Sequence, residues 1–367
     1  MSANIHLIIP DLFLPQQFAA SACNGLSLPA LEKLLARSRQ EPMAAQPHKG
    51  AIPQGDNVSL EARLCAHFGV VDESVAPITL QADGMQAEGF YWLRADPVHL
   101  QLQRAQMNLH ANVMLSADEA AQLCDSLNQH FAGERFKFFA PHPQRWYVRL
   151  GAAPDLVTHP LMQVAGKNIR PYMPSGADAL YWNGVMNEVQ MLLHEHAVNT
   201  AREARGEVVI NSVWLWGGGF AQTLPQRPFA RVVGDSLLPR AFAEYAGIPP
   251  HIPQGDNPTR GQCEGAMYFN LPGDERWLAD ASGEILVVWE GQRLAIQQGN
   301  LQAWQNAVLN LEQLCAAPLL NALSSGKVAQ MTIEVLHSSA SHRFILSRGD
   351  LWRVWRMPTS LAHYALK

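Results

Sequence analysis

The sequence has few cysteines, no basic tract and no long apolar run, and each absence excludes a class of protein. Its five cysteines are widely spaced and form no CxxC pair, so we expect neither a disulfide framework nor a thiolate zinc site. The 27 lysine and arginine residues are dispersed in a chain of net charge −5, which offers nothing to the phosphate backbone of nucleic acid. No stretch reaches the roughly 18 apolar residues that span a bilayer, and Met1–Pro15 lacks the basic start of a signal peptide. We therefore expect free thiols in a cytoplasmic protein that binds neither nucleic acid nor membrane.

What the chain does have is an alternation of short apolar runs and segments with helical spacing. At 367 residues, 48% of them hydrophobic, it is too long for one small domain. Strand signals lie at His6–Ile9, Val208–Trp216, Phe229–Val233, Ile285–Trp289 and Met331–Leu336, and helix signals at Leu28–Arg37, Asp178–His196, Leu237–Ala246 and Leu301–Leu323. This alternation predicts an α/β fold with a largely parallel sheet and helices on both of its faces.

A second, smaller pattern interrupts the alternation. Tyr91–Leu102 and Arg145–Leu150 have the composition of strands, and between them Ser116 and Glu119 form a capping box that opens a helix ending near Phe131. These signals predict a small inserted α+β domain over residues 85–152, with residues 1–84 and 153–367 forming the core.

The most specific stretch of the sequence is Asn187–Gly219. It contains His196, Asn199 and Arg202, followed by an apolar strand that ends in a glycine turn at Gly217. This stretch resembles the archaeal-type cofactor-independent phosphoglycerate mutases, in which His-Pro-Val-Asn precedes an arginine and a strand ending in glycine. The layout is also similar to that of mutase-related bacterial regulatory proteins of the RpfE type.

The resemblance extends to two upstream elements and implies a fold and a set of site residues. Arg94-Ala95-Asp96 is similar to the family's Arg-x-Asn element, and Ile8–Asp11 to its first strand with a metal-binding aspartate. The implied fold is an alkaline phosphatase-like core with an insertion. The ligand-binding candidates that the resemblance implies are Arg94, Asp96, His196, Asn199, Arg202, Gly217 and Gly218.

The chain departs from this family at the residues that perform its chemistry. The family uses a Ser or Thr nucleophile and two divalent metals, but Leu28 stands where its hydroxyl should be, and only the adjacent Ser27 remains as a candidate. The ligand motif Asp-x-x-Gly-His-x-Gly is replaced by Glu290–Ile296, and an Asp-His pair by Leu336-His337.

The residual metal-ligand candidates are therefore Asp11 and His337, with His342 as a weaker third. Two or three groups cannot hold a pair of metals, so we expect no metal or other cofactor. Two divalent ions (Mn, Co, Zn or Mg) belong only to an alternative in which the chain is active.

Each candidate also has a structural interpretation. Asp11 can cap a loop, His337 can be hydrogen-bonded scaffold, and each arginine can form a surface ion pair. The glycines can make a tight turn instead of a phosphate cradle. His194 and His196, placed by the pattern on one helix, would point apart and could not share a metal ion.

Three hypotheses follow from the sequence. The favoured one is a protein that has lost catalysis and regulates, or binds a small phosphorylated or carboxylated ligand. The second is an active metal-dependent mutase or phosphatase that uses Asp11, Ser27 and His337. The third is a structural or interaction protein whose segment Asp350–Arg356 contacts a partner or, as a homo-oligomer, a second copy.

Overall fold

The computed structural model describes residues 2–43, 58–103, 105–224, 227–234, 236–248, 250–251, 278, 282–337 and 341–365. The chain forms two compact units. Unit 1 comprises Met1–Pro47, Ile52–Leu64 and Gln226–Lys367, and unit 2 is mainly Cys65–Pro225. The insertion predicted at 85–152 lies inside unit 2, which extends beyond it on both sides.

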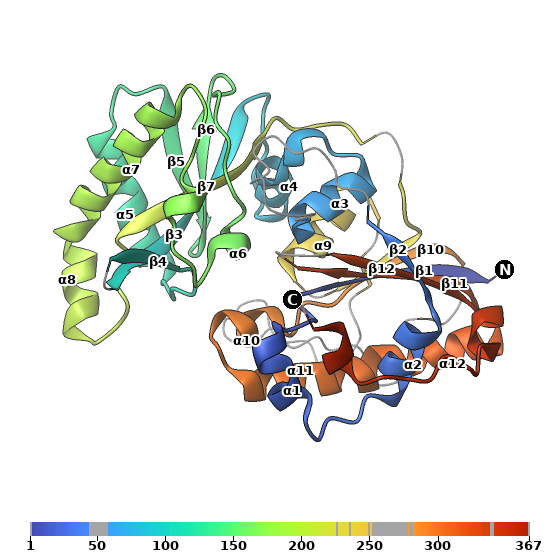
Figure 1. Ribbon diagram of the computed structural model, residues 1–367. Helices are drawn as coiled ribbons and strands as arrows, with labels where there is room; N and C mark the ends of the chain where they lie inside the picture. The colour runs from blue at the N-terminus through green and yellow to red at the C-terminus, as the bar shows by residue number, and fades with distance from the viewer. Residues whose placement is uncertain are drawn as a thin grey trace. The chain divides into compact units, whose positions relative to one another are not determined.

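Unit 1 contains a seven-stranded sheet in the order β2-β12-β11-β1-β10-β8-β9 (Figure 1). The strands are β1 (Ala3–Pro10), β2 (Arg39–Pro42), β8 (Arg231–Val233), β9 (Pro250–His251), β10 (Gly283–Val288), β11 (Val328–Leu336) and β12 (His342–Ser347). Strands β11, β1, β10, β8 and β9 are mutually parallel, and β12 and β2 add antiparallel edges. The prediction of a largely parallel sheet is therefore confirmed for this unit.

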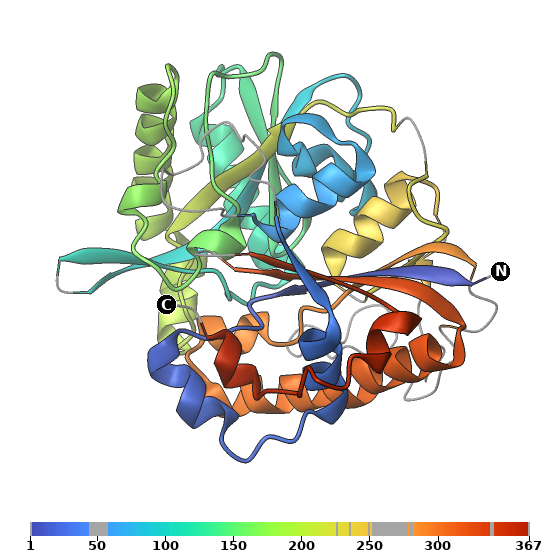
Figure 2. The same ribbon diagram turned by 45° about the vertical axis from the view of Figure 1, so that its right-hand side comes forward.

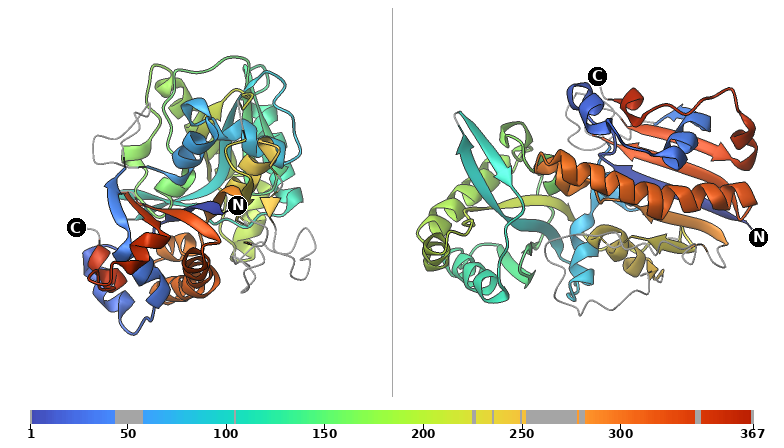
Figure 3. Two further views of the ribbon diagram at one scale, coloured as in Figure 1. Left: turned by 90° about the vertical axis from the view of Figure 1, so that its right-hand side faces the viewer. Right: turned by 90° about the horizontal axis from the view of Figure 1, so that it is seen from below.

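Helices flank the sheet of unit 1. They are α1 (Gln16–Cys23), α2 (Pro29–Arg37), α9 (Leu237–Tyr245), α10 (Arg293–Gln297), α11 (Leu301–Leu311) and α12 (Ala317–Ser325), while α3 (Leu60–Phe68) continues into unit 2. Helices α1, α2, α11 and α12 lie along one face, and α9 lies on the other (Figures 1 and 3). A single π-helical turn, Glu312–Ala316, joins α11 to α12.

Helix α2 begins where the sequence predicts. Pro29 occupies its first turn, a position that does not need a backbone N–H donor. Leu31, Leu34 and Leu35 follow at helical spacing and are buried against the sheet and the α11–α12 segment. Burial of this stripe is what holds a nine-residue helix that would be marginal alone.

Unit 2 contains five strands, all paired in antiparallel fashion (Figure 2). They are β3 (Tyr91–Gln103), β4 (Gln106–His110), β5 (Phe136–His142), β6 (Arg145–Leu150) and β7 (Ser212–Gly219). The first half of β3 lies between β6 and β7, and its second half pairs with β4. The sequence pattern around β7 predicted another parallel α/β unit, and that prediction is wrong because β7 joins the antiparallel sheet of unit 2.

The helices of unit 2 are α4 (Val75–Ala82), α5 (Ala117–His130), α6 (Leu161–Val164), α7 (Ala179–His194) and α8 (Ala197–Ala204). The capping box predicted at the start of α5 is confirmed, since Ser116 accepts from the N–H of Glu119 and Glu119 accepts in return. The expected single helix through His196 is broken, because α7 ends at His194 and His196 is the N-cap of α8.

The described cysteines are buried or partly buried, whereas the tryptophans divide into a buried and an exposed group. Cys65, Cys124 and Cys315 are buried and Cys23 is partly buried, with no disulfide among these four, whereas Cys263 lies outside the described residues. Most tryptophans fill the interiors of the two units, but Trp352 and Trp355 are 77% and 74% exposed. Within the described ranges, no helix has the length and apolarity to cross a lipid bilayer.

Candidate functional site

Two predicted residues meet at the carboxyl edge of the parallel sheet of unit 1. Strands β1 and β11 pair with Pro10 opposite Leu336, so Asp11 and His337 directly follow neighbouring strand ends. The backbone N–H of Asp11 donates to the carbonyl of Leu336 at 2.7 Å. Asp11 has a φ of 55°, a left-handed conformation that short polar side chains tolerate better than most. The chain therefore turns sharply at Asp11, directly after the strand end that pairs with the strand end before His337.

The third residual candidate is turned toward other partners. His342 opens β12, where its ring packs edge-on against Phe13 with centroids 5.5 Å apart. Its Nδ1 lies 2.9 Å from Nε2 of Gln40, so the imidazole is bonded within the edge of the sheet. Burial lowers the pKa of His342, which favours the neutral ring.

A buried arginine connects the strand ends to a second pair of acids. Arg293, in α10, is 8% exposed and lies 2.8 Å from Oε1 of Glu290, which follows β10. Its Nε lies 3.5 Å from Oδ2 of Asp11, and Nη1 lies 4.0 Å from Oε1 of Glu61 in α3. Carboxylates from three separate elements of unit 1 thus surround one guanidinium.

Glu61 is the most deeply buried member of this group, which we call the Arg293 cluster (Asp11, Glu61, Glu290 and Arg293). Its side chain is 1% exposed, and within the described part of the chain neither carboxylate oxygen has a hydrogen bond of normal geometry. Burial raises the pKa of Glu61 and the charge of Glu290 acts in the same sense, whereas Arg293, the Glu61 backbone and Ser59 act against them. The guanidinium is the cationic group that opposes the desolvation of this acid.

The remaining polar groups at this edge also point into the protein. Gln292 is fully buried and donates Nε2 to the carbonyl of Pro10, while its Oε1 has no hydrogen-bond partner among the residues that the structure describes. The hydroxyl of Ser236, which follows β8, donates to Glu290. This edge therefore has several carboxylate and amide oxygens, and the carboxylates lie around the guanidinium of Arg293.

This arrangement does not fit a pair of divalent metals. In the part of the chain that the structure describes, no three His, Cys, Asp or Glu side chains are grouped so that they could hold a metal ion. A guanidinium lies among the carboxylates, and its positive charge opposes the approach of another cation.

The start of α2 contains no hydroxyl at the position expected for the nucleophile. Leu28 is 1% exposed and is the N-cap residue, while Ser27 before it lies on the surface. The N–H groups of Ala30 and Leu31 donate to the two carboxylate oxygens of Glu312 at 2.7 and 2.8 Å. The π-helical turn supplies this carboxylate, which occupies the positive end of the helix.

In unit 2, Arg94 and Asp96 are both buried and pair with each other. Nη2 of Arg94 lies 2.6 Å from Oδ1 of Asp96, and Nε1 of Trp216 donates to the other oxygen at 2.7 Å. The guanidinium also lies over the rings of Tyr147 and Trp216, 5.1 Å from each centroid. Burial raises the pKa of Asp96, and the contacts with Arg94 and Trp216 act to lower it. The net effect is a raised pKa, because these contacts offset the desolvation of the carboxylate only in part.

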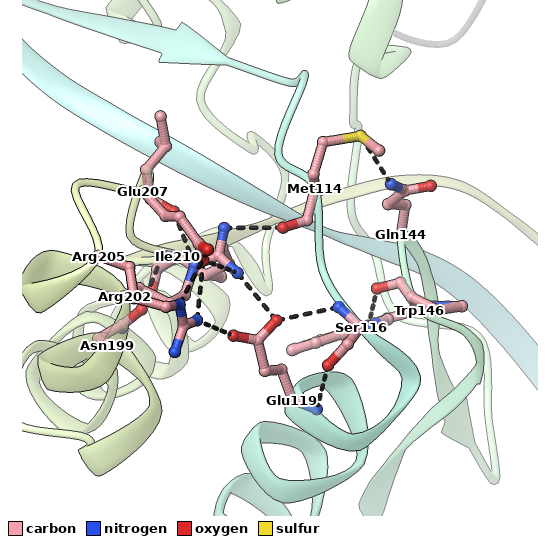
Figure 4. A network of polar contacts seen from close by, with 12 residues as sticks. Met114, Ser116, Glu119, Gln144, Trp146, Asn199, Arg202, Arg205, Glu207 and Ile210 are labelled. Carbon is pink, nitrogen blue, oxygen red and sulfur yellow. Dashed lines mark hydrogen bonds and ion pairs between the residues drawn. The ribbon is translucent and has the colours of Figure 1, made fainter. Parts of the chain in front are cut away.

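The motif around α8 forms a corner that joins α5, α8 and β7 (Figure 4). Arg202 is 3% exposed and donates to Oε2 of Glu119 at 2.9 Å and to the carbonyl of Met114 at 2.7 Å. Asn199 bonds the backbone N–H and the carbonyl of Ile210. Their polar atoms are thus occupied by protein partners.

His196 caps the same corner. Its Nδ1 accepts from the N–H of Val198 at 3.1 Å, and its Nε2 lies 2.9 Å from Oγ of Ser126 in α5. The N–H of Val198, in the first turn of α8, has no acceptor within its own helix, and the imidazole of His196 supplies one. A new helix therefore begins after His196, and α7 ends at His194.

The glycines that end β7 allow close packing. A Cβ on Gly218 would lie 2.4 Å from the hydroxyl oxygen of Tyr91, and one on Gly219 would lie 2.0 Å from Oγ of Ser74. Gly217 has a φ of 63°, which glycine adopts freely. The lack of a side chain at Gly218 and Gly219 therefore allows Tyr91 and Ser74 to pack closer to β7 than a Cβ atom would permit.

The sequence candidates therefore fall into two groups. Asp11 and His337 follow paired strand ends in unit 1. Unit 2 contains the other candidates: Arg94, Asp96, Asn199 and Arg202 as buried groups, His196 as an N-cap, and Gly217 and Gly218 at the end of β7. Their role in ligand binding stays a prediction. Sequence reasoning missed Glu61 and Arg293. Two signals in the sequence could have indicated them: a charged residue, Glu61, at the apolar start of α3, and a basic residue, Arg293, within the stretch Glu290–Ile296.

Part of the chain is similar in sequence to known proteins. Residues 81–199 match the sequence model of the 2,3-bisphosphoglycerate-independent phosphoglycerate mutases. A protein of that name from Methanosarcina mazei is 25% identical over 218 residues, which are 56% of this chain and 53% of that protein. One from Methanothrix thermoacetophila is 32% identical over 112 residues, 30% of this chain and 28% of that protein. The chain thus spans about half the length, or less, of the curated relatives that it matches.

A solved structure extends the likeness to the fold of nearly the whole chain. The PH0037 protein from Pyrococcus horikoshii superposes with a TM-score of 0.55 at 13% identity, covering 94% of this chain and 87% of that one. At this identity the likeness concerns the fold alone. The chain is accordingly similar to phosphoglycerate mutases in the sequence of its middle part and has the fold of PH0037.

Proposed function

We propose that this chain is a phosphoglycerate mutase-related protein that does not transfer phosphoryl groups and acts in regulation or in binding a small phosphorylated or carboxylated ligand. The observation that carries the proposal is the start of α2. Leu28, which the resemblance sets at the nucleophile's position, is buried, and the backbone donors that follow it bind the carboxylate of Glu312.

The chemistry explains why this position matters. Covalent phosphoryl transfer requires a hydroxyl or another nucleophile that can hold the group, and a leucine side chain cannot. The free N–H groups of a helix N-terminus attract phosphate, but here a resident carboxylate has satisfied two of them. The Arg293 cluster adds a second obstacle, because it places a fixed cation where a metal would be needed.

An activity assay of the full chain tests the proposal. The purified protein is incubated with 3-phosphoglycerate, and separately with a generic phosphate monoester, in the presence of Mn²⁺, Co²⁺, Zn²⁺ or Mg²⁺. We expect no turnover above the blank. Metal-dependent turnover that disappears in Asp11→Asn but persists in Glu244→Gln, an exposed change in the same unit, would overturn the proposal.

The binding half of the proposal has its own measurement. The relatives are named for a phosphoglycerate substrate, so 3-phosphoglycerate and inorganic phosphate are the probes to titrate by calorimetry. Saturable binding of 3-phosphoglycerate, weakened at high salt, supports a ligand-binding role. No heat and no thermal stabilisation at millimolar ligand would remove the ligand from the proposal and leave regulation through a macromolecule.

The second candidate is an active mutase or phosphatase, and the meeting of Asp11 with His337 at one sheet edge favours it. In that case Ser27 would be the nucleophile. Loss of turnover in Ser27→Ala, with Ser21→Ala on the neighbouring helix as the control, would support this candidate.

A further inference from the structure

We propose that Lys137 and Arg149, on the sheet of unit 2, form the binding site for the phosphate group of a small ligand. The proposal rests on the ligand-binding role given above and deepens it by naming a site. Of the arginines that the family resemblance implies for ligand binding, Arg94 and Arg202 are each already paired with a carboxylate of the protein. Cations without such a partner lie elsewhere in the same unit.

Lys137 and Arg149 lie directly opposite each other on neighbouring strands. Lys137 of β5 is paired with Arg149 of β6 in the antiparallel ladder, and β5 is the last strand of the sheet order. Side chains at such positions project from the same face, with Cβ atoms about 4.5–5.5 Å apart. Like charges directly opposite each other repel and weaken the pairing of the strands. An anion bound between the two cations would remove this cost.

No acid of the described ranges neutralises this pair. The guanidinium carbon of Arg149 lies 4.5 Å from the ring centroid of Phe90 and 5.3 Å from that of Phe139. The ammonium of Lys137 lies 5.7 Å from the centroid of Phe139. Among the described residues, neither cationic side chain forms an ion pair or a hydrogen bond. A ring face attracts a cation without occupying its N–H donors, so these donors are available to a ligand.

A second arginine on the same strand shows the difference that a carboxylate makes. Arg145, Tyr147 and Arg149 are alternate residues of β6 and therefore project from one face of the sheet. Arg145 and Tyr147 both donate to Asp83, at 2.6 Å each. Arg149 is partly buried like Arg145 but has no carboxylate beside it. A partly buried charge gains from an opposite charge, and here a ligand would have to supply it.

The two cations suit a phosphate group better than a carboxylate. A guanidinium presents its N–H groups in a planar fork that matches two oxygens of one phosphate, and an ammonium adds a point charge. A phosphate monoester carries about two negative charges near neutral pH, whereas a carboxylate carries one. The partly buried rings of Phe90 and Phe139 lie beside the cations and displace water, which strengthens charge-assisted bonds.

Calorimetric titration of the full chain with 3-phosphoglycerate, inorganic phosphate and glycerate tests the proposal. We expect the first two to bind, and glycerate, which has the carboxylate but no phosphate, to give no saturable heat. Arg149→Gln and Lys137→Gln should each weaken the binding of 3-phosphoglycerate by about tenfold or more, as expected for one lost charge-assisted contact. Glycerate binding as tightly as 3-phosphoglycerate would overturn the assignment to phosphate.

Arg170→Gln is the matched control. Arg170 is an exposed arginine of the same unit, and the residue before it bonds to β4, at the other end of the sheet order from β5. Its loss removes the same charge, so the affinity for 3-phosphoglycerate should change by less than about twofold at physiological salt, where distant charges are screened. Equal weakening in Arg170→Gln and Arg149→Gln would indicate general attraction by positive charge and would overturn the site.

Lys137→Glu separates ligand binding from a structural role of the pair. The new carboxylate lies opposite Arg149, where opposite charges attract, so the thermal unfolding midpoint should be at or above that of wild type while phosphate binding is lost. Unchanged affinity for 3-phosphoglycerate in both Lys137→Glu and Arg149→Gln would overturn the inference and leave ligand binding to another part of the chain. A wild type that binds neither 3-phosphoglycerate nor phosphate would refute the ligand-binding part of the proposed function and this site with it, so the two failures are distinguishable.

Discussion

The buried carboxylates of Asp96, Glu312 and Glu61 have three different kinds of partner. Asp96 is paired with a guanidinium and an indole N–H, and Glu312 accepts two backbone N–H groups. Glu61 lies 4.0 Å from the guanidinium of Arg293 within the cluster. The partners of a buried acid determine whether it stabilises or destabilises the fold. They matter more than whether the acid is an aspartate or a glutamate.

The first prediction concerns Glu312. Replacing it with glutamine in Glu312→Gln removes the charge that accepts from Ala30 and Leu31 at the start of α2. We expect the free energy of unfolding to fall by about 1–3 kcal/mol, as when charge-assisted bonds at a helix start are lost. Urea unfolding measures this change. The exposed Glu244→Gln should change it by less than about 0.5 kcal/mol, and equal effects of the two would contradict the assigned role.

At the scale of elements, polar contacts join α4 to the sheet of unit 2. Asp83 at the end of α4 accepts from Arg145 at 2.6 Å and from the hydroxyl of Tyr147 at 2.6 Å, both on β6. Burial acts to raise the pKa of Asp83, but Arg145 and Tyr147 outweigh it and hold the pKa below its ordinary value. The contact of α4 with β6 therefore depends on an ionised carboxylate.

The second prediction is the pH dependence of that contact. A depressed pKa in the folded state means that Asp83 stabilises the fold above its ordinary pKa of about 3.9 and that this contribution is lost as pH falls through the lower, folded value. Relative to wild type, Asp83→Asn should lose about 2–4 kcal/mol near neutral pH. Urea titrations from about pH 5 to pH 2 should show the difference shrinking. A difference that stays constant over this range would refute the assignment.

The third prediction concerns the end of β7. In Gly219→Ala the new Cβ would meet Oγ, Cβ and Cα of Ser74 at 2.0, 2.2 and 3.0 Å, so the backbone before α4 must move. We expect a loss of about 1–3 kcal/mol in the free energy of unfolding, as for an overpacked interior. Gly184→Ala in α7 is the control, since nothing lies within 4 Å of its added Cβ and alanine favours helix. It should raise stability by about 0.5–1 kcal/mol.

At the scale of the whole molecule, local signals predicted individual elements better than their pairing. The helix start at Pro29, the capping box at Ser116 and the strand Arg145–Leu150 were all predicted, because each depends on neighbouring residues. The pairing of β7 with β3 was not, since an apolar strand before a glycine turn has the same appearance in a parallel and an antiparallel sheet.

The candidate site shows the same division. Asp11 and His337 were named from motif positions, and strand pairing brings them together. Apart from the local pair of Glu290 and Arg293, the Arg293 cluster depends on contacts between residues more than two hundred positions apart, such as Glu61 with Arg293. No local pattern encodes a pairing of that kind, so a single sequence could not reveal it.

The fourth prediction tests the division into units. A fragment of residues 65–225 contains every partner of β3 and should unfold cooperatively when expressed alone. A fragment of residues 85–152 lacks β7, which pairs with β3, and α4, whose Ala76 and Leu80 pack in one core with Trp92 of β3, and it should remain unfolded. Circular dichroism and amide NMR dispersion measure both. A folded 85–152 fragment would mean that the smaller boundaries describe the true domain.

The order of strands in unit 1 has a consequence for synthesis on the ribosome. Strand β1 lies between β10 and β11, so Ile5 pairs with Ile285 and Met331, which are translated roughly 280 residues or more later. At about 5–20 residues per second, the first strand emerges tens of seconds before its neighbours exist. During that interval an apolar strand has exposed edges and no native partner, which makes the nascent chain a natural client for chaperones until translation nears its end.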